Sequence, residues 1–253
     1  MADSSSEKPT ILLLCLGGDL WTNILDKTET FVAGIDLLLK KARLKRAKTL
    51  SAALKFLDEN RPDGILIADS GVVAQENREI LGRLTAFAKS GGTVVYSFCF
   101  ATSIRPGVMG QHWDHTWKLP WKAGQYHRTT FELNETATYT VMTLGKNSSS
   151  SSVFDAEIQE CMWLPQYSQK AVHLSQVYPE NRWYMPTSHS RLESLIPAPD
   201  LINRITNLSE MPVAFARVGD GYVGYTGDVN QETGTNLVLL RMFNLDGRQA
   251  LGA

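Results

Sequence analysis

The sequence has no apolar run long enough to cross a bilayer and no excess of either charge. A membrane-spanning helix needs about 20 consecutive apolar residues, whereas the apolar run Ile11–Leu16 is only six residues long. The 25 Lys and Arg residues nearly balance the 26 Asp and Glu residues, so no basic surface for nucleic acid or anionic lipid is indicated. We therefore expect neither a membrane nor a nucleic acid among its partners.

Cysteine is scarce. The three cysteines, Cys15, Cys99 and Cys161, are an odd number and lie far apart in the chain, which is not the pattern of a disulfide-stabilised secreted domain. The first ten residues also lack the charged segment and apolar core of a secretory signal. These features favour a reducing, cytoplasmic location.

Common cofactor motifs are absent as well. Gly17-Gly18-Asp19 follows an apolar run, but the G-x-G-x-x-G spacing of a dinucleotide site is missing, as are the P-loop motif and the G-x-S-x-G motif of serine hydrolases. His112 and His115 lie three residues apart, yet a metal site normally needs three or four ligands. A metal-assisted hydrolase is therefore the least favoured hypothesis, and we expect no cofactor and no metal.

The first hundred residues alternate between short apolar runs and amphipathic segments. The apolar runs predict strands buried on both faces, and apolar residues at helical spacing predict helices. The predicted strands are 10–16, 43–47, 64–68 and 93–97, and the predicted helices are 30–41, 49–57 with Thr49 as N-cap, and 76–90. Short connections in this order predict parallel strands and an open, doubly wound, mostly parallel α/β sheet of the flavodoxin-like type.

The middle of the chain, about residues 105–205, departs from this alternation. It contains a block rich in Trp and His at 105–131, a serine run at Ser148–Ser152 that predicts a loose loop, and a proline-rich irregular stretch. Beyond it, 212–218 and 222–225 predict a hairpin and 235–243 a closing helix. Without repeats or linkers, we expect a disordered tail at 1–9 and a single domain at 10–253 with an irregular insertion.

Ligands of open α/β sheets bind beyond the carboxyl ends of the strands. Four predicted loops leave those ends, and the polar or reactive residues in them are predicted to share one pocket. These residues are Asp19, Ser70, Cys99, Asp228 and Asn230. Asp228 or Asn230 is also expected to cap the closing helix, with Glu232 in its first turn.

Cys99 lies in Ser97-Phe-Cys-Phe-Ala101, a pattern similar to a nucleophile elbow. Small residues two before and two after the nucleophile permit the sharp strand-to-helix turn, and a helix N-terminus would lower the pKa of the thiol. Pro106 limits the length of any following helix. Because free cysteine often packs as a small apolar residue, a catalytic and a structural role both stay open.

The order of elements, this elbow segment and the late segment 221–234 (G-Y-V-G-Y-T-G-D-V-N-Q-E-T-G) resemble the class I glutamine amidotransferase-like superfamily. The resemblance is to its trehalose-utilisation-type branch and to a group of fungal proteins, which also carry stretches similar to 120–131 and 167–174. It covers most of the chain and implies the amidotransferase-like fold. It implies little about activity, because that of the fungal group is largely undefined.

The sequence departs from that superfamily where catalysis would occur. Its glutaminases pair the elbow cysteine with a late histidine and a glutamate two residues apart, whereas the matching place here is Thr226-Gly-Asp228, and no histidine follows His189. Glutamine hydrolysis is therefore not expected. A catalytic Cys99 would need another base, for which His127 is the first candidate, with Asp228 orienting it or acting as a base itself.

Two hypotheses follow. The first is a small-molecule enzyme, a cysteine-dependent hydrolase, hydratase or lyase, with Cys99, His127 and Asp228 as catalytic residues and the Trp113–Trp121 block as a lid. Its substrate-binding residues would be Asp19, Trp21, Ser70, Phe100, Trp117, Trp121, Arg128 and Asn230. Arg128 would bind a carboxylate or stabilise negative charge. The alternative, favoured by loss of the His–Glu pair, is a catalytically silent relative that binds a metabolite or a protein. A homodimer is compatible with both.

Overall fold

The computed structural model describes residues 8–138, 164–193, 204–205 and 207–245. Most of the predicted tail, the serine run Ser148–Ser152 and Cys161 lie outside the described residues. None of the helices in the described ranges is long and apolar enough to cross a membrane.

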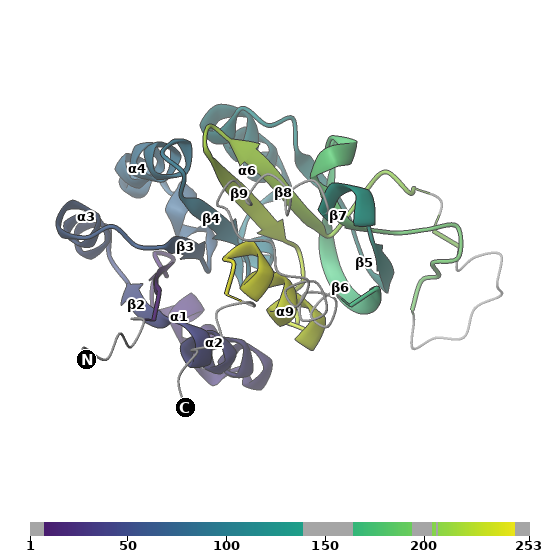
Figure 1. Cartoon of the computed structure of the whole chain (residues 1–253), viewed down its shortest axis with the longest axis horizontal. Coiled ribbons are helices and arrows are strands. Elements are labelled where there is room, and N and C mark those ends of the chain that lie inside the picture. The colour runs from purple at the N-terminus through teal and green to yellow at the C-terminus, as the bar shows by residue number, and fades with distance from the viewer. Residues whose placement is uncertain (1–7, 139–163, 194–203, 206, 246–253) are drawn as a thin grey trace, which may run out of the picture.

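In the described part of the chain, nine strands form one sheet in the order β2-β1-β3-β4-β9-β8-β7-β5-β6 (Figure 1). Neighbours from β2 to β9 run parallel, and neighbours from β9 to β6 run antiparallel. The strands are β1 (Thr10–Leu14), β2 (Arg43–Ala47), β3 (Gly64–Ile67), β4 (Thr93–Tyr96), β5 (Lys122–Leu133), β6 (Gln166–Ser175), β7 (Arg182–Met185), β8 (Val213–Val218) and β9 (Gly221–Thr226).

Helices cover both faces of the parallel strands (Figure 1). They are α1 (Asp19–Lys27), α2 (Glu29–Lys41), α3 (Leu50–Glu59), α4 (Arg78–Lys89), α5 (Phe100–Ser103), α6 (Pro106–His112) and α9 (Thr233–Met242), with short turns η1 (Ser70–Val73), η2 (Gln75–Asn77), η3 (Trp113–Trp117, π-helical) and η4 (Pro179–Asn181). Alternate residues of β1 enter two different core clusters: Leu12 and Leu14 pack with α3 and α4, Ile11 and Leu13 with α1, α2 and α9.

The sequence predictions for the parallel half are confirmed. The strand predicted at 43–47 is β2 itself, and the other predicted strands and helices differ from the observed elements by one or two residues at most of their ends. Thr49 caps α3 as expected, its hydroxyl accepting from the amide of Ala52 at 3.2 Å. The sheet is therefore doubly wound and mixed, and α1 is the helix that the sequence pattern did not reveal.

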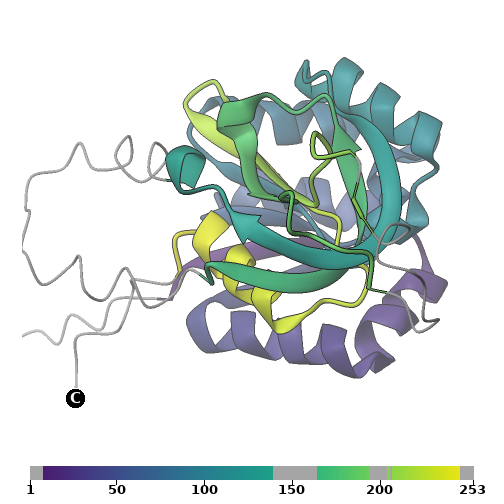
Figure 2. The same ribbon diagram turned by 90° about the vertical axis from the view of Figure 1, so that its right-hand side faces the viewer.

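The antiparallel half curls until β6 meets the chain on either side of the β8–β9 hairpin. Leu174 bridges Met211, and Ala171 bridges Asp228. The amide of Val172 donates to the carbonyl of Gly227, and the amide of Val229 to that of Lys170, both at 2.9 Å. In Figure 2 the curved strands β5 and β6 lie side by side with α9 next to β6. The free edge of β6 is thus partly paired, which holds the segment after β9 against it.

The predicted lid Trp113–Trp121 is wrong, because these tryptophans belong to the core. Trp113 and Trp121 are fully buried, and Trp113 packs edge-on against Tyr96 and Tyr225 of the sheet. The indole of Trp117 donates to the Tyr96 hydroxyl at 3.0 Å, and a second hydrogen bond of 2.9 Å joins that hydroxyl to Nε2 of His112. Burial of the indoles against an apolar sheet face explains the aromatic block without a ligand.

Candidate functional site

The loops that leave β1 and β3 pack tightly against each other at the carboxyl ends of the strands. A Cβ added to Gly71 would lie 2.1 Å from the carbonyl carbon of Leu16, and one added to Gly17 would lie 2.9 Å from Oδ1 of Asp69. No real side chain tolerates such contacts, so glycine is required for this approach. Trp21 also packs on Gly17, its Cδ1 2.7 Å from the added Cβ.

The prediction that Cys99 lies in an accessible pocket is wrong, because the residue is buried in the core. Cys99 is 1% exposed and belongs to the core cluster that contains Leu13, Leu66 and Val95. Burial, together with a smaller contribution from the negative charge of Asp69, raises the pKa of its thiol to about 12. Within the described ranges the sulfur makes no hydrogen bond, so neither His127 nor Asp228 is its partner. A thiolate is therefore disfavoured at neutral pH.

The strained residue of the turn after β4 is Phe98 and not Cys99. Phe98 has a φ of 54°, in the left-handed region that side chains rarely adopt, whereas Cys99 has a φ of −78°. In a nucleophile elbow the strained position carries the nucleophile. Here it carries a fully buried ring whose centroid lies 5.9 Å from that of Phe31, so hydrocarbon fills the place next to the turn.

Asp69 is a buried acid directly after β3 that was not among the predicted site residues. It is 2% exposed, and burial raises the pKa of its carboxyl to about 6, opposed by hydrogen bonds from the amides of Gly71, Gly17 and Leu16. The amide of Gly71 donates to Oδ1 at 2.9 Å. The carboxyl group therefore fastens the two loops together. Asp69 could have been found from the sequence, because it is an acid directly after a strand that is predicted to be buried on both faces.

The other predicted rim residues do not gather around a ligand site. Asp19 is exposed at the start of α1, Trp21 is half-buried, and the hydroxyl of Ser70 donates to the carbonyl of Ser103 at 3.0 Å. Phe100, Trp117 and Trp121 are core residues. Phe100, Trp117 and Trp121 therefore have almost no accessible surface with which to bind a substrate.

Asp228 holds the start of α9. Its carboxylate accepts from the amides of Asn230 at 2.9 Å and Glu232 at 2.7 Å, and from the hydroxyl of Thr235 at 2.5 Å. Asp228 is fully buried, and this burial raises the pKa of its carboxyl against those hydrogen bonds. The predicted capping role agrees with this geometry, and the hydrogen bonds leave little of the carboxylate free to act as a base.

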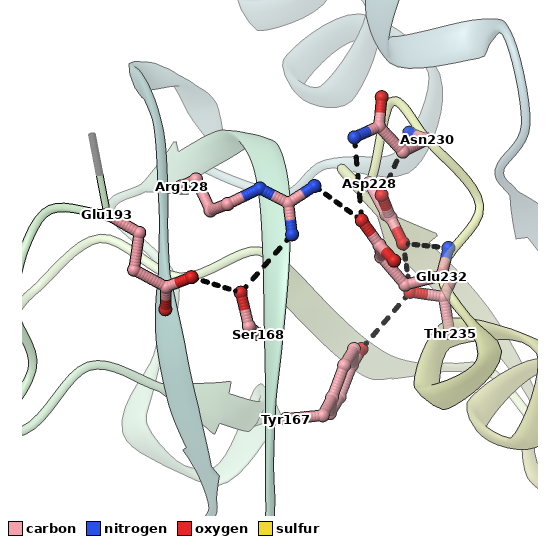
Figure 3. Close-up of polar contacts among 8 residues, drawn as sticks. All are labelled: Arg128, Tyr167, Ser168, Glu193, Asp228, Asn230, Glu232 and Thr235. Atoms are coloured by element: carbon pink, nitrogen blue, oxygen red, sulfur yellow. Dashed lines mark hydrogen bonds and ion pairs between the residues drawn. The ribbon is translucent and has the colours of Figure 1, made fainter. Parts of the chain in front are cut away.

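A polar network centred on Arg128 joins segments that are distant in sequence (Figure 3). Arg128 on β5 pairs with Glu232 before α9 at 2.5 Å and donates to the hydroxyl of Ser168 on β6 at 3.3 Å. Ser168 donates in turn to Glu193 at 2.7 Å, and the side-chain amide of Asn230 donates to Glu232 at 3.4 Å. The structure therefore brings the predicted residues Arg128, Asp228 and Asn230 together in one network.

A pocket of about 290 Å³ lies beside this network, on the face of β5 that carries Thr130 and Glu132. Its lining is polar, and we call it the charged pocket. It is lined by Thr130, Glu132, Gln166, His189, Ser190, Arg191 and Glu193. Thr130 donates to Glu193 at 3.0 Å, and Thr187 donates to Glu132 at 2.9 Å. Sequence reasoning missed Glu193 and Ser168, because only the strand register places Ser168 opposite Thr130.

His127 lies on the other face of β5, next to His173 of β6. The ring centroids are 4.2 Å apart, and Nδ1 of His173 bonds the carbonyl of Gln125 at 2.8 Å. Burial lowers the pKa of both imidazoles, that of His173 to about 3. The pair is therefore neutral at physiological pH. His112 is buried and His115 exposed, and no described group of three or more His, Cys, Asp or Glu side chains could hold a metal ion.

A larger pocket of about 650 Å³ lies between α6 and the start of β5. One face of α6 and η3 borders it with Gly107, Gly110, Gln111 and Asp114, and Lys122 and Gln176 lie opposite. None of the predicted site residues lines this pocket.

No family model and no curated protein matches this sequence. Among solved structures it is similar to a ThuA-like protein from Bacteroides uniformis, with 11% identity, a TM-score of 0.49, and 99% of this chain and 95% of that chain covered. A ThuA-like protein from Parabacteroides merdae gives 10% identity, a TM-score of 0.49 and coverage of 98% and 93%.

A β-galactosidase from the haloarchaeon Halorubrum lacusprofundi is similar at 13% identity and a TM-score of 0.49, over 99% of this chain and 32% of that one. The structural neighbours thus include ThuA-like proteins. No residue role passes to this chain at such identities, and the resemblance to the fungal group stays a prediction.

Proposed function

We propose that this protein binds a small polar metabolite in the charged pocket and that Cys99 has a structural role. The observation that carries the proposal is the pocket itself, where side chains from β5, β6 and the segment after β7 surround about 290 Å³. Ligand sites are concave and have a few polar groups held in place by neighbours. Here hydroxyl groups hold the carboxylates of Glu132 and Glu193.

The burial of Cys99 favours this proposal over a cysteine-dependent hydrolase, hydratase or lyase. Nucleophilic catalysis needs a thiolate with a base or ion-pair partner within hydrogen-bond reach. The Cys99 sulfur is 1% exposed, and burial raises the pKa of its thiol to about 12. Both features are those of a core cysteine.

The proposal is tested by thermal unfolding with a panel of sugars, polyols, amines, amino acids and carboxylic acids. Gln166→Trp would fill the charged pocket from its exposed edge, and Gln111→Trp is the matched control at the edge of the larger pocket. At least one compound should raise the Tm of the wild type, of Gln111→Trp and of Cys99→Ala, but not of Gln166→Trp. A panel without any such compound, or a shift that survives in Gln166→Trp, would refute the proposal.

A second candidate is an enzyme that uses Asp69 for acid–base chemistry. It is favoured by the position of Asp69, a buried acid directly after the carboxyl end of β3, where α/β proteins bind ligands, and burial raises the pKa of its carboxyl to about 6. In a metabolite extract followed by mass spectrometry, the wild type and Cys99→Ala should consume the same compound and Asp69→Asn should not. Equal consumption by all three proteins, or by none, would exclude this candidate.

A further inference from the structure

We infer that the charged pocket selects a ligand that carries a protonated amine. This inference rests on the proposed function and specifies its ligand class. It starts from the charges around the cavity, where Glu132 and Glu193 contribute two carboxylates and Arg191 one guanidinium. Carboxylates therefore outnumber guanidinium groups around the pocket by two to one.

Neither carboxylate has a basic partner among the described residues. The carboxylate of Glu193 accepts from the hydroxyls of Thr130 and Ser168, and the carboxylate of Glu132 accepts from the hydroxyl of Thr187. The backbone amide of Glu193 donates to the carbonyl of Arg128. A hydroxyl donor orients a carboxylate without neutralising it. Among the described residues, neither carboxylate is therefore in an ion pair of its own.

The basic residues nearest the pocket are engaged elsewhere. Arg128 pairs with Glu232 at 2.5 Å, and Lys170 lies over the ring of Tyr126, 5.2 Å from its centroid. Arg191 donates through Nη1 to the carbonyls of Ser188 and Ser190, both at 2.9 Å. Each of these cations thus has other partners, and in the described ranges none forms an ion pair with Glu132 or Glu193, with which a cationic ligand could pair.

The hydrogen-bonding capacity of the pocket also favours a protonated amine. A carboxylate accepts about four hydrogen bonds, and Glu193 uses part of this capacity for Thr130 and Ser168. An ammonium group brings three donors and a positive charge, whereas an anionic ligand would meet two like charges. The volume of about 290 Å³ suits a ligand of only a few carbons.

A matched ligand series tests the inference with the wild-type protein. Calorimetric titrations with 4-aminobutan-1-ol, butane-1,4-diol and 4-hydroxybutanoate compare a cation, a neutral molecule and an anion of one chain length. The amine should bind about tenfold or more tightly than the diol, as for hydrogen bonds to charged groups. The anion should bind more weakly than the diol, and added salt should weaken amine binding.

Variants locate the effect. Glu193→Gln and Glu132→Gln should each reduce amine binding about tenfold and leave diol binding within about twofold, because the amide keeps the shape but not the charge. Glu180→Gln removes an exposed acid of η4 that does not line the pocket, and is the control. Unfolding curves of all three variants check that each remains folded.

The possible failures are distinguishable. If the diol binds as tightly as the amine and Gln166→Trp abolishes both, the amine inference is wrong and the proposed function stands. The same holds if the anion binds best, or if none of the three binds while a compound from the broader panel does so at this pocket. If no compound binds there at all, both proposals fall.

Discussion

The parallel and antiparallel halves of the sheet differ in how their side chains are buried. In β1, β3 and β4 nearly every side chain is buried, because helices cover both faces. In β5 and β6 buried residues alternate with partly exposed ones, and polar groups such as Thr129, Gln169 and His173 lie on the inner face. The parallel half therefore has few polar groups left to offer a ligand, whereas the antiparallel half presents a polar outer face.

Because of this difference, the candidate site lies on the antiparallel half and not at the ends of the parallel strands. The general rule for open α/β sheets places ligands beyond the carboxyl ends of the parallel strands. In this protein those ends are closed by the contact between Gly71 and Leu16 and by the buried Phe98. The polar residues that line the charged pocket lie instead on β5, β6 and the segment after β7. A fold shared with other proteins does not fix where the site lies.

Thiol labelling should give the largest contrast between the halves. In a Cys15→Ala, Cys161→Ala background, Cys99 should react with a thiol reagent at least about 10³-fold more slowly than an unfolded control, because reaction requires opening of the core. His189→Cys in the same background places a thiol at the charged pocket and should react rapidly. Fast native labelling of Cys99 would contradict the structure of this turn.

Removal of a core aromatic from the side of the parallel strands should cost the most stability. Trp113→Ala is expected to lower the free energy of unfolding by about 3–5 kcal/mol, since the fully buried indole packs on Tyr96 and Tyr225. Urea denaturation measures the loss. Tyr178→Ala, at a side chain 53% exposed in the antiparallel half, should change stability by less than about 0.5 kcal/mol. Similar losses in both variants would contradict the assignment of Trp113 to the core.

Asp69 should make stability depend on pH. Its carboxyl pKa is about 6 in the folded protein against about 3.9 when unfolded, so the folded state binds the proton more tightly. This contribution is fully present below the unfolded pKa and is lost as the pH rises from about 4 to about 6. The wild type should lose roughly 2–3 kcal/mol relative to Asp69→Asn over that range. Parallel curves for the two proteins would show that the carboxyl pKa is not raised.

The Arg128–Glu232 pair should contribute least to stability. Its side chains are 28% and 31% exposed, and pairs near the surface typically contribute under about 1 kcal/mol. A double-mutant cycle of Arg128→Gln and Glu232→Gln, followed by urea denaturation, measures the coupling free energy. A coupling above about 2 kcal/mol would mean that the pair supports the fold of the antiparallel half beyond its ordinary surface role.

The sequence predicted the parallel half well because its signal is local. Runs such as Ile11–Leu16 and the spacing of Leu50, Leu54 and Leu57 indicate strand and helix without knowledge of any partner. Strand β5 was not predicted, because polar residues such as His127 and Thr129 alternate with other polar residues, so the sequence shows no alternation of apolar and polar side chains. Helix α1 was not predicted either, since its few apolar residues include the exposed Leu20.

Part of the candidate site was also predictable. Arg128, Asp228 and Asn230 were predicted as site residues and meet in one network, but the cysteine expected beside them lies in the core. The elbow pattern was misleading because small residues around Cys99 permit a sharp turn whichever residue takes the strained position. The backbone gave that position to Phe98, one residue earlier.

By itself, the sequence determined the buried parallel strands, their covering helices and the cap of α3, because these follow from side-chain polarity and spacing within a few residues. Only the tertiary structure decided that Ser168 faces Thr130, that Asp228 meets Ala171, and that Glu193 reaches the same pocket as Glu132. Pairing register and sheet curvature depend on contacts between distant segments, and no local pattern of polarity encodes them.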